Sequence, residues 1–200
     1  MPRPKQRPAT AEQILDIAEA LIQTRSYNAF SYQDISDALG IRKASIHYHF
    51  ASKADLGAAV VNRYVERFGA ALAAIGRDQS KSSMAMLDFY IEPYVQFAKA
   101  PDRVCLCGAL AGEMPALPPE MRVHVDRFFK AHHAWLAGIL KRGVTRGEFK
   151  LTSPAAKTAR LVLAALQGAL LVKRTTGDPA QLKDVVTALK AQLSQAESRA

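Results

Sequence analysis

Apolar residues recur at helical spacing along almost the whole chain, and this pattern constrains the fold more than any other feature. In one stretch of the sequence the apolar positions are three or four residues apart, at Leu56, Val60, Tyr64, Phe68, Leu72 and Ile75. This spacing places them on one face of a helix. We find no segment with the apolar and polar alternation of a half-buried strand. The sequence therefore predicts an all-α protein of about nine helices.

Capping residues divide the first part of this pattern into separate helices. A hydroxyl residue followed three positions later by Gln or Asp, which is typical of a capping box, occurs at Thr10, Ser31 and Ser52. Gly40 is suited to the left-handed residue that ends a helix, and the next helix is expected to begin near Arg42. These signals predict two short helices between a first helix and a long fourth one.

Beyond residue 76 the helices become longer and more aromatic, which indicates a second domain. Pro93 removes a backbone hydrogen bond and predicts a kink, and the segment PALPP interrupts the helices. Ser153 and Pro154 predict a cap and a first-turn proline. The expected helices cover about 82–100, 103–114, 120–147, 154–176 and the region from 179. We place the domain boundary between residues 53 and 54, giving domains of 1–53 and 54–200.

The composition limits the classes of protein that fit. With 49% hydrophobic residues the 200-residue chain is too apolar to be disordered, and its net charge of +9 favours an acidic partner. Two cysteines are too few for a disulfide scaffold. The basic start MPRPKQRPAT lacks the apolar segment of a secretory signal, and no apolar run reaches the roughly 18–20 uncharged residues of a membrane span. We expect a cytoplasmic protein without a membrane partner.

The two final helices predict a contact with a second copy of the chain. The segment LVLAALQGALLVK is apolar around much of its circumference, and a helix of this kind must be buried on several sides. A homodimer through the last two helices would bury this surface. An ordinary internal helical core is the alternative.

The segment GIRKASIHYHFASK, residues 40–53, determines the functional prediction. Two short helices that meet at Gly40 form a helix-turn-helix, whose second helix enters the DNA major groove. Helical geometry turns Ile46 and Phe50 inward. His47 and His49 lie about 200° apart around the helix and cannot bind one metal ion together. No acid or nucleophile is spaced to make either histidine catalytic, so a DNA-facing helix explains the composition best. A solvated helix face with incidental histidines is the alternative.

The stretch FSYQDISDALGIRKASIHYHFASKADL, residues 30–56, resembles the DNA-binding domain of the TetR (tetracycline repressor) family. The hydroxyl cap, the turn of glycine and an apolar residue, the aromatic-His-Phe ending of the recognition helix and the following Ser-Lys all occur in register. The resemblance covers residues 11–57 and implies binding to double-stranded DNA. The implied DNA contacts are Ser31, Tyr32, Gln33, Arg42, Lys43, Ala44, Ser45, His47, Tyr48, His49 and Lys53.

Details of the DNA-binding segment differ from the family pattern. Many members have a small hydroxyl residue at the position of Arg42 and Tyr at the position of His47. Arg42 gives up a side-chain cap and gains a phosphate contact, while His47 makes backbone binding pH-sensitive, since histidine titrates near neutrality. A basic arm of Arg3, Lys5 and Arg7 is expected along the DNA.

The resemblance also implies a dimer on a palindromic operator and a small-molecule effector bound in the second domain. Two recognition helices must lie about 34–36 Å apart, and an effector that favours another spacing releases the DNA. The candidate pocket residues, each of which has ordinary core packing as its alternative, are Tyr64, Phe68, Phe89, Tyr90, Tyr94, Phe97, Phe128, Phe129, His132, Trp135 and Gln167.

The segment APDRVCLCGALAGEMP suggests a second way of sensing. If its helix begins at residue 102, Cys105 lies in the first turn, where unpaired amides stabilise a thiolate. The segment is similar to a TetR subgroup that senses electrophiles through a cysteine at the start of this helix. Cys105 and Cys107 point apart on a helix and cannot bond to each other. Buried, inert thiols are the alternative.

Two other functional classes were weighed against the regulator. A hydrolase or metalloenzyme would use His132, His133 and the cysteines, but no nucleophile, carboxylate pair or full ligand set has workable spacing. A basic protein that binds nucleic acid without sequence preference would also fit the charge. We expect a repressor with no cofactor, no metal and no catalytic residue, and not an enzyme.

Overall fold

The computed structural model describes residues 11–194, with side chains to residue 193. The Thr10 cap and the basic arm of Arg3, Lys5 and Arg7 lie outside the described residues. Within these limits the chain forms nine α-helices and one 3₁₀ turn, with no strand, so the all-α prediction is confirmed. The helices are α1 (Ala11–Arg25), α2 (Tyr32–Leu39), α3 (Lys43–His49), α4 (Lys53–Arg77), α5 (Ser83–Ala98), α6 (Leu106–Ala111), α7 (Pro119–Thr145), α8 (Ala155–Thr176) and α9 (Ala180–Ser194), with the 3₁₀ turn η1 (Met114–Ala116) before α7.

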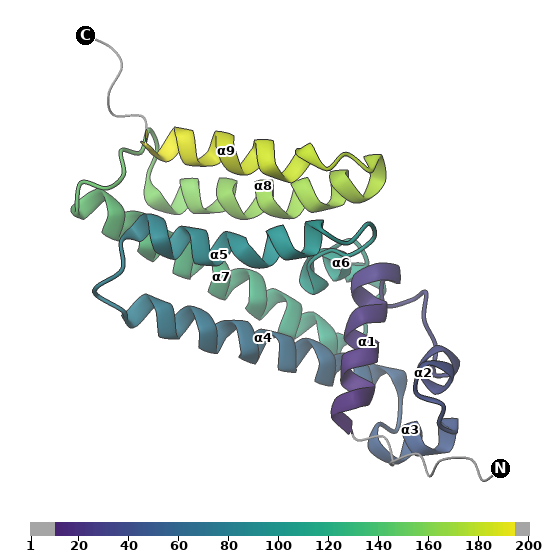
Figure 1. Ribbon diagram of the computed structural model, residues 1–200. Helices are drawn as coiled ribbons and strands as arrows, with labels where there is room; N and C mark the ends of the chain where they lie inside the picture. The colour runs from purple at the N-terminus through teal and green to yellow at the C-terminus, as the bar shows by residue number, and fades with distance from the viewer. Residues whose placement is uncertain (1–10, 195–200) are drawn as a thin grey trace, which may run out of the picture.

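The helices form a small group and a large group joined by α4 (Figure 1). Helices α1, α2 and α3 lie together at one end of the molecule, and α5, α7, α8 and α9 form the larger body. Helix α7 packs along both α4 and α8, while α8 and α9 run side by side along the edge farthest from α4. The short α6 lies beside α1, where the two groups meet.

The caps predicted from the sequence are present at α2 and α4. Ser31 and Asp34 form a capping box before α2, and Ser52 and Asp55 form another before α4. Gly40 has φ 64°, the left-handed conformation that ends α2 at little steric cost. Arg42, in contrast, caps α3 with its backbone alone, because its side chain makes no capping hydrogen bond. The two short helices are therefore fixed by their ends.

The sequence prediction was wrong at two helix starts. Helix α6 begins at Leu106 and has six residues, whereas the spacing predicted a helix over 103–114. Residue Val104 instead donates its N–H to the carbonyl of Gln23 in α1, 3.2 Å away. Pro154 itself is the N-cap of α8, so Ser153 does not cap this helix as predicted. Pro93 lies inside α5, which is helical on both sides of it.

Helix α8 begins one residue after its predicted start and is long and mainly apolar. Among the helices of residues 11–194 it is the one that is long and apolar enough to cross a membrane, by length and composition. Lys157, Arg160, Lys173 and Arg174 lie within it, so it holds no run of roughly 18–20 uncharged residues, as the sequence indicated. It packs against α7 and α9, and 33% of its apolar stretch is buried inside the protein.

An ion-pair network fixes α1 against α4. Arg63 contacts the carboxylates of Glu12, Asp16 and Glu19 at 2.8–3.1 Å, and Arg67 contacts Glu19 at 2.7 Å. Glu19 is buried, and its contacts with Arg63 and Arg67 compensate the hydration that its carboxylate loses. Removal of both arginines would leave a buried, unpaired charge. Helix α1, which packs on α2 and α3, is thereby joined to α4.

Candidate DNA-binding surface and effector cavity

Helix α3 presents a polar face to solvent and a narrow apolar face to the core. Ile46 is fully buried and Phe50 is half-buried, as predicted from the helical spacing. The outward residue Tyr48 is 86% exposed, which is unusual for a large aromatic side chain. The other exposed side chains of this face are those of Arg42, Lys43, Ala44, Ser45, His47 and His49. The side chains that the sequence predicts on the DNA-facing side of α3 are therefore all exposed.

Tyr32 is the exception among the predicted DNA contacts. Its side chain is 8% exposed, and its hydroxyl donates to the carbonyl of Phe50, 3.0 Å away. Its ring packs on His47 with a centroid separation of 4.7 Å. Tyr32 therefore joins α2 to the end of α3, and its side chain is largely withdrawn from solvent, while its contact with DNA stays a prediction. Its neighbours Ser31 and Gln33 are exposed.

The position of Lys53 is set by aromatic rings. Its Nζ lies 4.6 Å from the ring centroids of both Tyr27 and Phe30, within the range of cation–π attraction. Partial burial lowers the pKa of its ammonium, and the nearby carboxylate of Glu113 opposes this shift. Lys53 is thus held at the start of α4 by the loop between α1 and α2.

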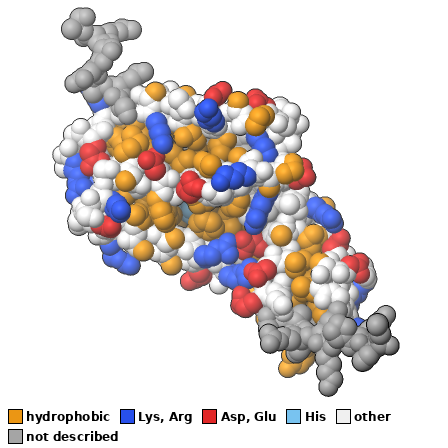
Figure 2. Space-filling model, viewed as in Figure 1, with side chains coloured by type: hydrophobic (Ala, Val, Ile, Leu, Met, Phe, Trp, Pro, Cys, Tyr) orange, Lys and Arg blue, Asp and Glu red, His pale blue; other side chains and the backbone are white. Residues whose placement is uncertain are grey.

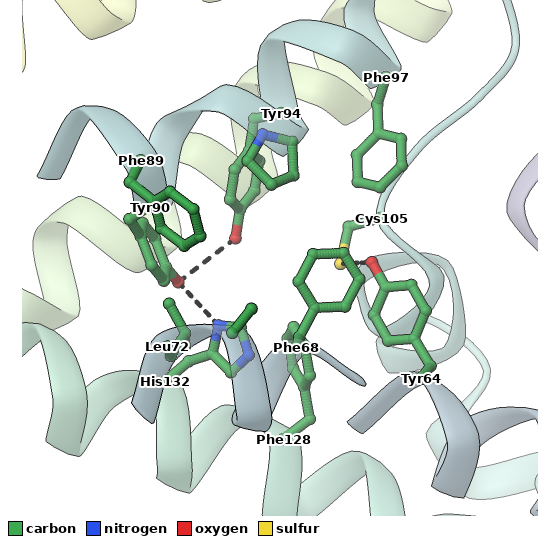
Figure 3. Close-up of a pocket in the computed structure, with 12 residues that line it drawn as sticks. Tyr64, Phe68, Leu72, Phe89, Tyr90, Tyr94, Phe97, Cys105, Phe128 and His132 are labelled. Atoms are coloured by element: carbon green, nitrogen blue, oxygen red, sulfur yellow. Dashed lines mark hydrogen bonds between the residues drawn. The ribbon is translucent and has the colours of Figure 1, made fainter. Parts of the chain in front are cut away.

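An aromatic cavity lies between α4, α5 and α7 (Figure 3). Its volume is about 60 Å³, which is small beside typical pockets for drug-sized ligands. Tyr90 and His132 lie at one end in this view, and Phe97 and Cys105 lie at the other. The lining residues are Tyr64, Phe68, Ala71, Leu72, Phe89, Tyr90, Pro93, Tyr94, Phe97, Cys105, Phe128 and His132. None of these side chains is an acid, a lysine or an arginine.

Hydrogen bonds connect the polar groups around this cavity. The Tyr90 hydroxyl lies 3.1 Å from His132 Nδ1 and 3.5 Å from the Tyr94 hydroxyl. Gln167 donates from Nε2 to the Tyr94 hydroxyl at 3.1 Å and to Cys105 Sγ at 3.4 Å. The Tyr64 hydroxyl completes the row, 3.5 Å from the same sulfur. The cavity therefore offers a ligand neutral hydrogen-bonding groups.

Burial keeps these groups uncharged at neutral pH. Desolvation lowers the pKa of His132 to about 4, so its imidazole is neutral. Desolvation also raises the pKa of Tyr64, Tyr90 and Tyr94, which keeps their phenols protonated. A charged ligand would find no counter-charge among the lining residues.

Three of the predicted pocket residues lie outside this cavity. Phe129 and Gln167 line a separate surface groove between α6, α7 and α8. Trp135 lines a groove between α4 and α7, where its Nε1 donates to the carbonyl of Leu72 at 2.8 Å and its ring stacks on Tyr90. The other eight predicted residues line the cavity. Sequence reasoning missed Ala71, Leu72 and Cys105 as lining residues.

Both thiols are buried, Cys105 at the N-cap of α6 and Cys107 at the second position of this helix. Cys105 is the N-cap of α6 and forms part of the cavity wall, so its predicted place within the first turn of a helix from residue 102 is wrong. Cys107 lies within α6, and burial raises the pKa of its thiol well above the usual range. Cys105 is the thiol that a molecule in the cavity would meet.

Two family models match this chain. The model described as bacterial regulatory proteins, tetR family, matches residues 14–60, and the model described as tetracyclin repressor-like, C-terminal domain, matches residues 84–189. The chain belongs to the TetR family. The fold expected from the resemblance is thus confirmed: an N-terminal helix-turn-helix domain followed by a helical C-terminal domain.

Individual proteins resemble most of the chain or a third of it. An uncharacterized HTH-type transcriptional regulator in the lacX 3'region of Lactococcus lactis subsp. lactis is 30% identical over 173 residues, 84% of this chain and 85% of the relative. The HTH-type transcriptional repressor BdcR of Escherichia coli (strain K12) is 37% identical over 67 residues, 34% of each chain. A TetR-family regulator from Agrobacterium tumefaciens has a crystal structure with TM-score 0.86 and 34% identity, covering 92% of this chain and 97% of that chain. The protein is a DNA-binding transcriptional regulator, a class whose members are generally not enzymes.

Proposed function

We propose that this TetR-family protein is a cytoplasmic, homodimeric repressor that binds a palindromic operator and is released by a small uncharged effector. The observation that carries the proposal is the aromatic cavity, which is bounded by the same helix α4 that begins at Lys53. The Escherichia coli relative, which matches 34% of the chain, is named a repressor. We also propose that residues 1–53 bind DNA and residues 54–200 bind the effector and the second copy.

The proposed dimer buries the outer faces of α8 and α9. Leu161 and Val172 of α8 are 52% and 44% exposed, and they lie at opposite ends of the helix. Hydrophobic side chains also gather on the viewed face of the larger body (Figure 2). Burial of apolar surface favours association. A two-fold dimer would hold two recognition helices about one DNA turn apart, which a palindrome requires.

The cavity favours an uncharged and mainly apolar effector. Its aromatic walls would pack against the ligand, and the hydroxyls of Tyr90 and Tyr94 would bond one or two polar atoms. Tyr64, Phe68 and Leu72 bring α4 into contact with the ligand. A ligand that binds better when α4 is tilted would shift the dimer toward a spacing that does not fit the operator.

Modification of Cys105 is a second candidate trigger. Its sulfur lies in the cavity wall, hydrogen-bonded by Gln167, so an electrophile that enters the cavity would meet it. Addition to this thiol would fill the cavity permanently. The added group would then favour the tilted position of α4, as a reversible effector would.

Selection from a random duplex library tests the repressor proposal. Recovery of a palindrome with half-sites about one turn apart supports the dimer, whereas no enriched sequence contradicts specific recognition and favours the non-specific binder. A gel shift of the selected duplex with N-ethylmaleimide then tests the thiol. We expect Cys105→Ser to abolish release by this reagent and Cys107→Ser to leave it unchanged. Release that persists in Cys105→Ser rules this thiol out as the sensor.

A further inference from the structure

The segment 103–113 connects the cavity to the DNA-binding end of the molecule. Its Cys105 forms part of the cavity wall, and its last residue, Glu113, bonds the loop between α1 and α2. Helix α6 fills the space between them and is closed by the bond from the Ala109 N–H to the Cys105 carbonyl, 2.9 Å long. We call residues 103–113 the strap. A short hydrogen-bonded helix moves as a unit, so displacement of one end displaces the other.

The strap is attached to the DNA-binding end at two places. At its start, Arg103 Nε donates to Gln23 Oε1 at 2.8 Å, and the Val104 N–H donates to the Gln23 carbonyl at 3.2 Å. At its end, the Glu113 carboxylate accepts from the Tyr27 N–H at 2.7 Å and from the N–H and side-chain amide of Asn28 at 3.4 and 3.3 Å. Hydrogen bonds to a charged acceptor are the stronger kind. Both attachments join it to α1 or to the loop that follows.

The attachment at Glu113 leads directly to Lys53. The Tyr27 N–H donates to the Glu113 carboxylate, and the centroid of the Tyr27 ring lies 4.6 Å from the Lys53 ammonium. Lys53 belongs to α4, whereas the ring belongs to the loop that the strap holds. Movement of the strap would therefore slide the ring relative to the ammonium, and cation–π attraction requires a separation within about 6 Å.

The contact between the strap and α1 contains a polar atom without a partner. Gln23 is fully buried, and within the described residues its Nε2 finds no hydrogen-bond acceptor. A buried donor without a partner destabilises the arrangement that contains it. The attachment at Gln23 is therefore weaker than its two hydrogen bonds to the strap alone would make it.

We propose that the strap transmits the state of the cavity to the DNA-binding end, by moving the loop at Tyr27 and with it the support of Lys53. This inference rests on the proposed function, because it assumes that filling the cavity releases DNA. It adds a route that does not pass through the tilt of α4. Glu113 is its coupling residue, and it touches neither the cavity nor the DNA-facing helix α3.

Amide hydrogen exchange in the DNA-free protein tests the strap without any effector. Cys105→Phe fills the cavity from the strap side, and Cys105→Met is a milder version should the ring prevent folding. We expect either change to speed exchange at the Tyr27 amide about tenfold, because its one carboxylate bond is weakened. Exchange in α8 serves as the control for global stability. A Tyr27 amide unaffected by a folded variant overturns the proposal.

A double-mutant cycle on the selected operator completes the test. Cys105→Phe should weaken operator binding, and the loss should be much smaller when Glu113→Ala has already released the strap from the loop at Tyr27. Glu120→Ala is the matched control, since it removes a nearby carboxylate with no bond to the loop. Equal losses with and without Glu113 overturn the strap while leaving operator binding in place. Failure to select any operator would instead count against the proposed repressor, and the exchange result would stand separately.

Discussion

The buried imidazole of His132 makes the stability of the folded protein depend on pH between about 4 and 6.5. Its imidazole is buried beside Phe128, with ring centroids 3.8 Å apart, and Nδ1 bonds the Tyr90 hydroxyl. Burial lowers the pKa of this histidine from 6.5 to about 4. Between these values the unfolded chain binds a proton that the folded protein does not, so stability falls as the pH falls.

The size of this effect follows from the two pKa values. Complete loss over the window from 6.5 to 4 corresponds to about 3 kcal/mol, since one pKa unit is about 1.4 kcal/mol. Between pH 7 and pH 5, where the folded imidazole stays mostly neutral, the same linkage gives a loss of about 2 kcal/mol. Above pH 7 the contribution is constant. A change of this size is a large fraction of the free energy of unfolding of a typical domain.

Urea unfolding at pH 7 and pH 5, at one fixed protein concentration, measures the loss. His132→Gln keeps a hydrogen-bonding partner for Tyr90 and removes the titration, so its stability should change by about 2 kcal/mol less than that of the original protein over this pH range. His133→Gln is the matched control, because this neighbouring ring lies at the surface and bonds the Ala156 carbonyl. If His132→Gln and the original protein lose the same stability between pH 7 and pH 5, titration of His132 is not the cause of the pH dependence.

Two further predictions concern the DNA-facing surface and the packing of α4. Lys43→Ala should weaken binding to the selected operator by about 1–3 kcal/mol more than binding to random DNA, whereas Lys53→Ala should weaken binding to both duplexes about equally. Fluorescence anisotropy on the two duplexes measures both effects. If Lys43→Ala also weakens binding to both duplexes equally, α3 does not read bases through Lys43. Gly57→Ala should destabilise the protein by about 1–3 kcal/mol in urea unfolding, because the added methyl would lie 2.5 Å from Met121 Sδ, while Gly69→Ala, whose methyl meets nothing within 4 Å, should be neutral or stabilising. Similar losses at both glycines would show that contact with Met121 is not the cause.

The parts of the fold that depend on local chemistry could be predicted from the sequence. Capping boxes at Ser31 and Ser52 and the left-handed Gly40 are set by neighbouring residues, and the structure has all three. The inward face of α3 also followed from the helical period. The start of α6 at Leu106 could not be predicted in the same way. Arg103, which precedes it, bonds Gln23, and these two residues are 80 positions apart along the chain.

The cavity lining shows which errors the sequence could have avoided. Phe128 and Phe129 are adjacent on α7 and point about 100° apart, so only one of them was able to face the cavity. The burial of Tyr32 was likewise visible in its spacing from Ile35, which shares its face of α2. Leu72 shares the helical face of Tyr64 and Phe68, so its place in the lining could also have been predicted. In contrast, no local pattern marks Cys105 as a lining residue, because α4, α5 and α7 bring the rest of the wall from distant segments.

The attachment of Glu113 to the loop at Tyr27 has a consequence for building chimeric biosensors. A designer who cuts between residues 53 and 54 and joins a foreign DNA-reading module would keep Glu113 but lose the amides and the Gln23 carbonyl that face the strap. The hybrid would still fold around α4 and bind its ligand, yet it would respond poorly, because the receiving surface belongs to the discarded module. Grafts that also transplant the matching residues at positions 23, 27 and 28 would preserve the response.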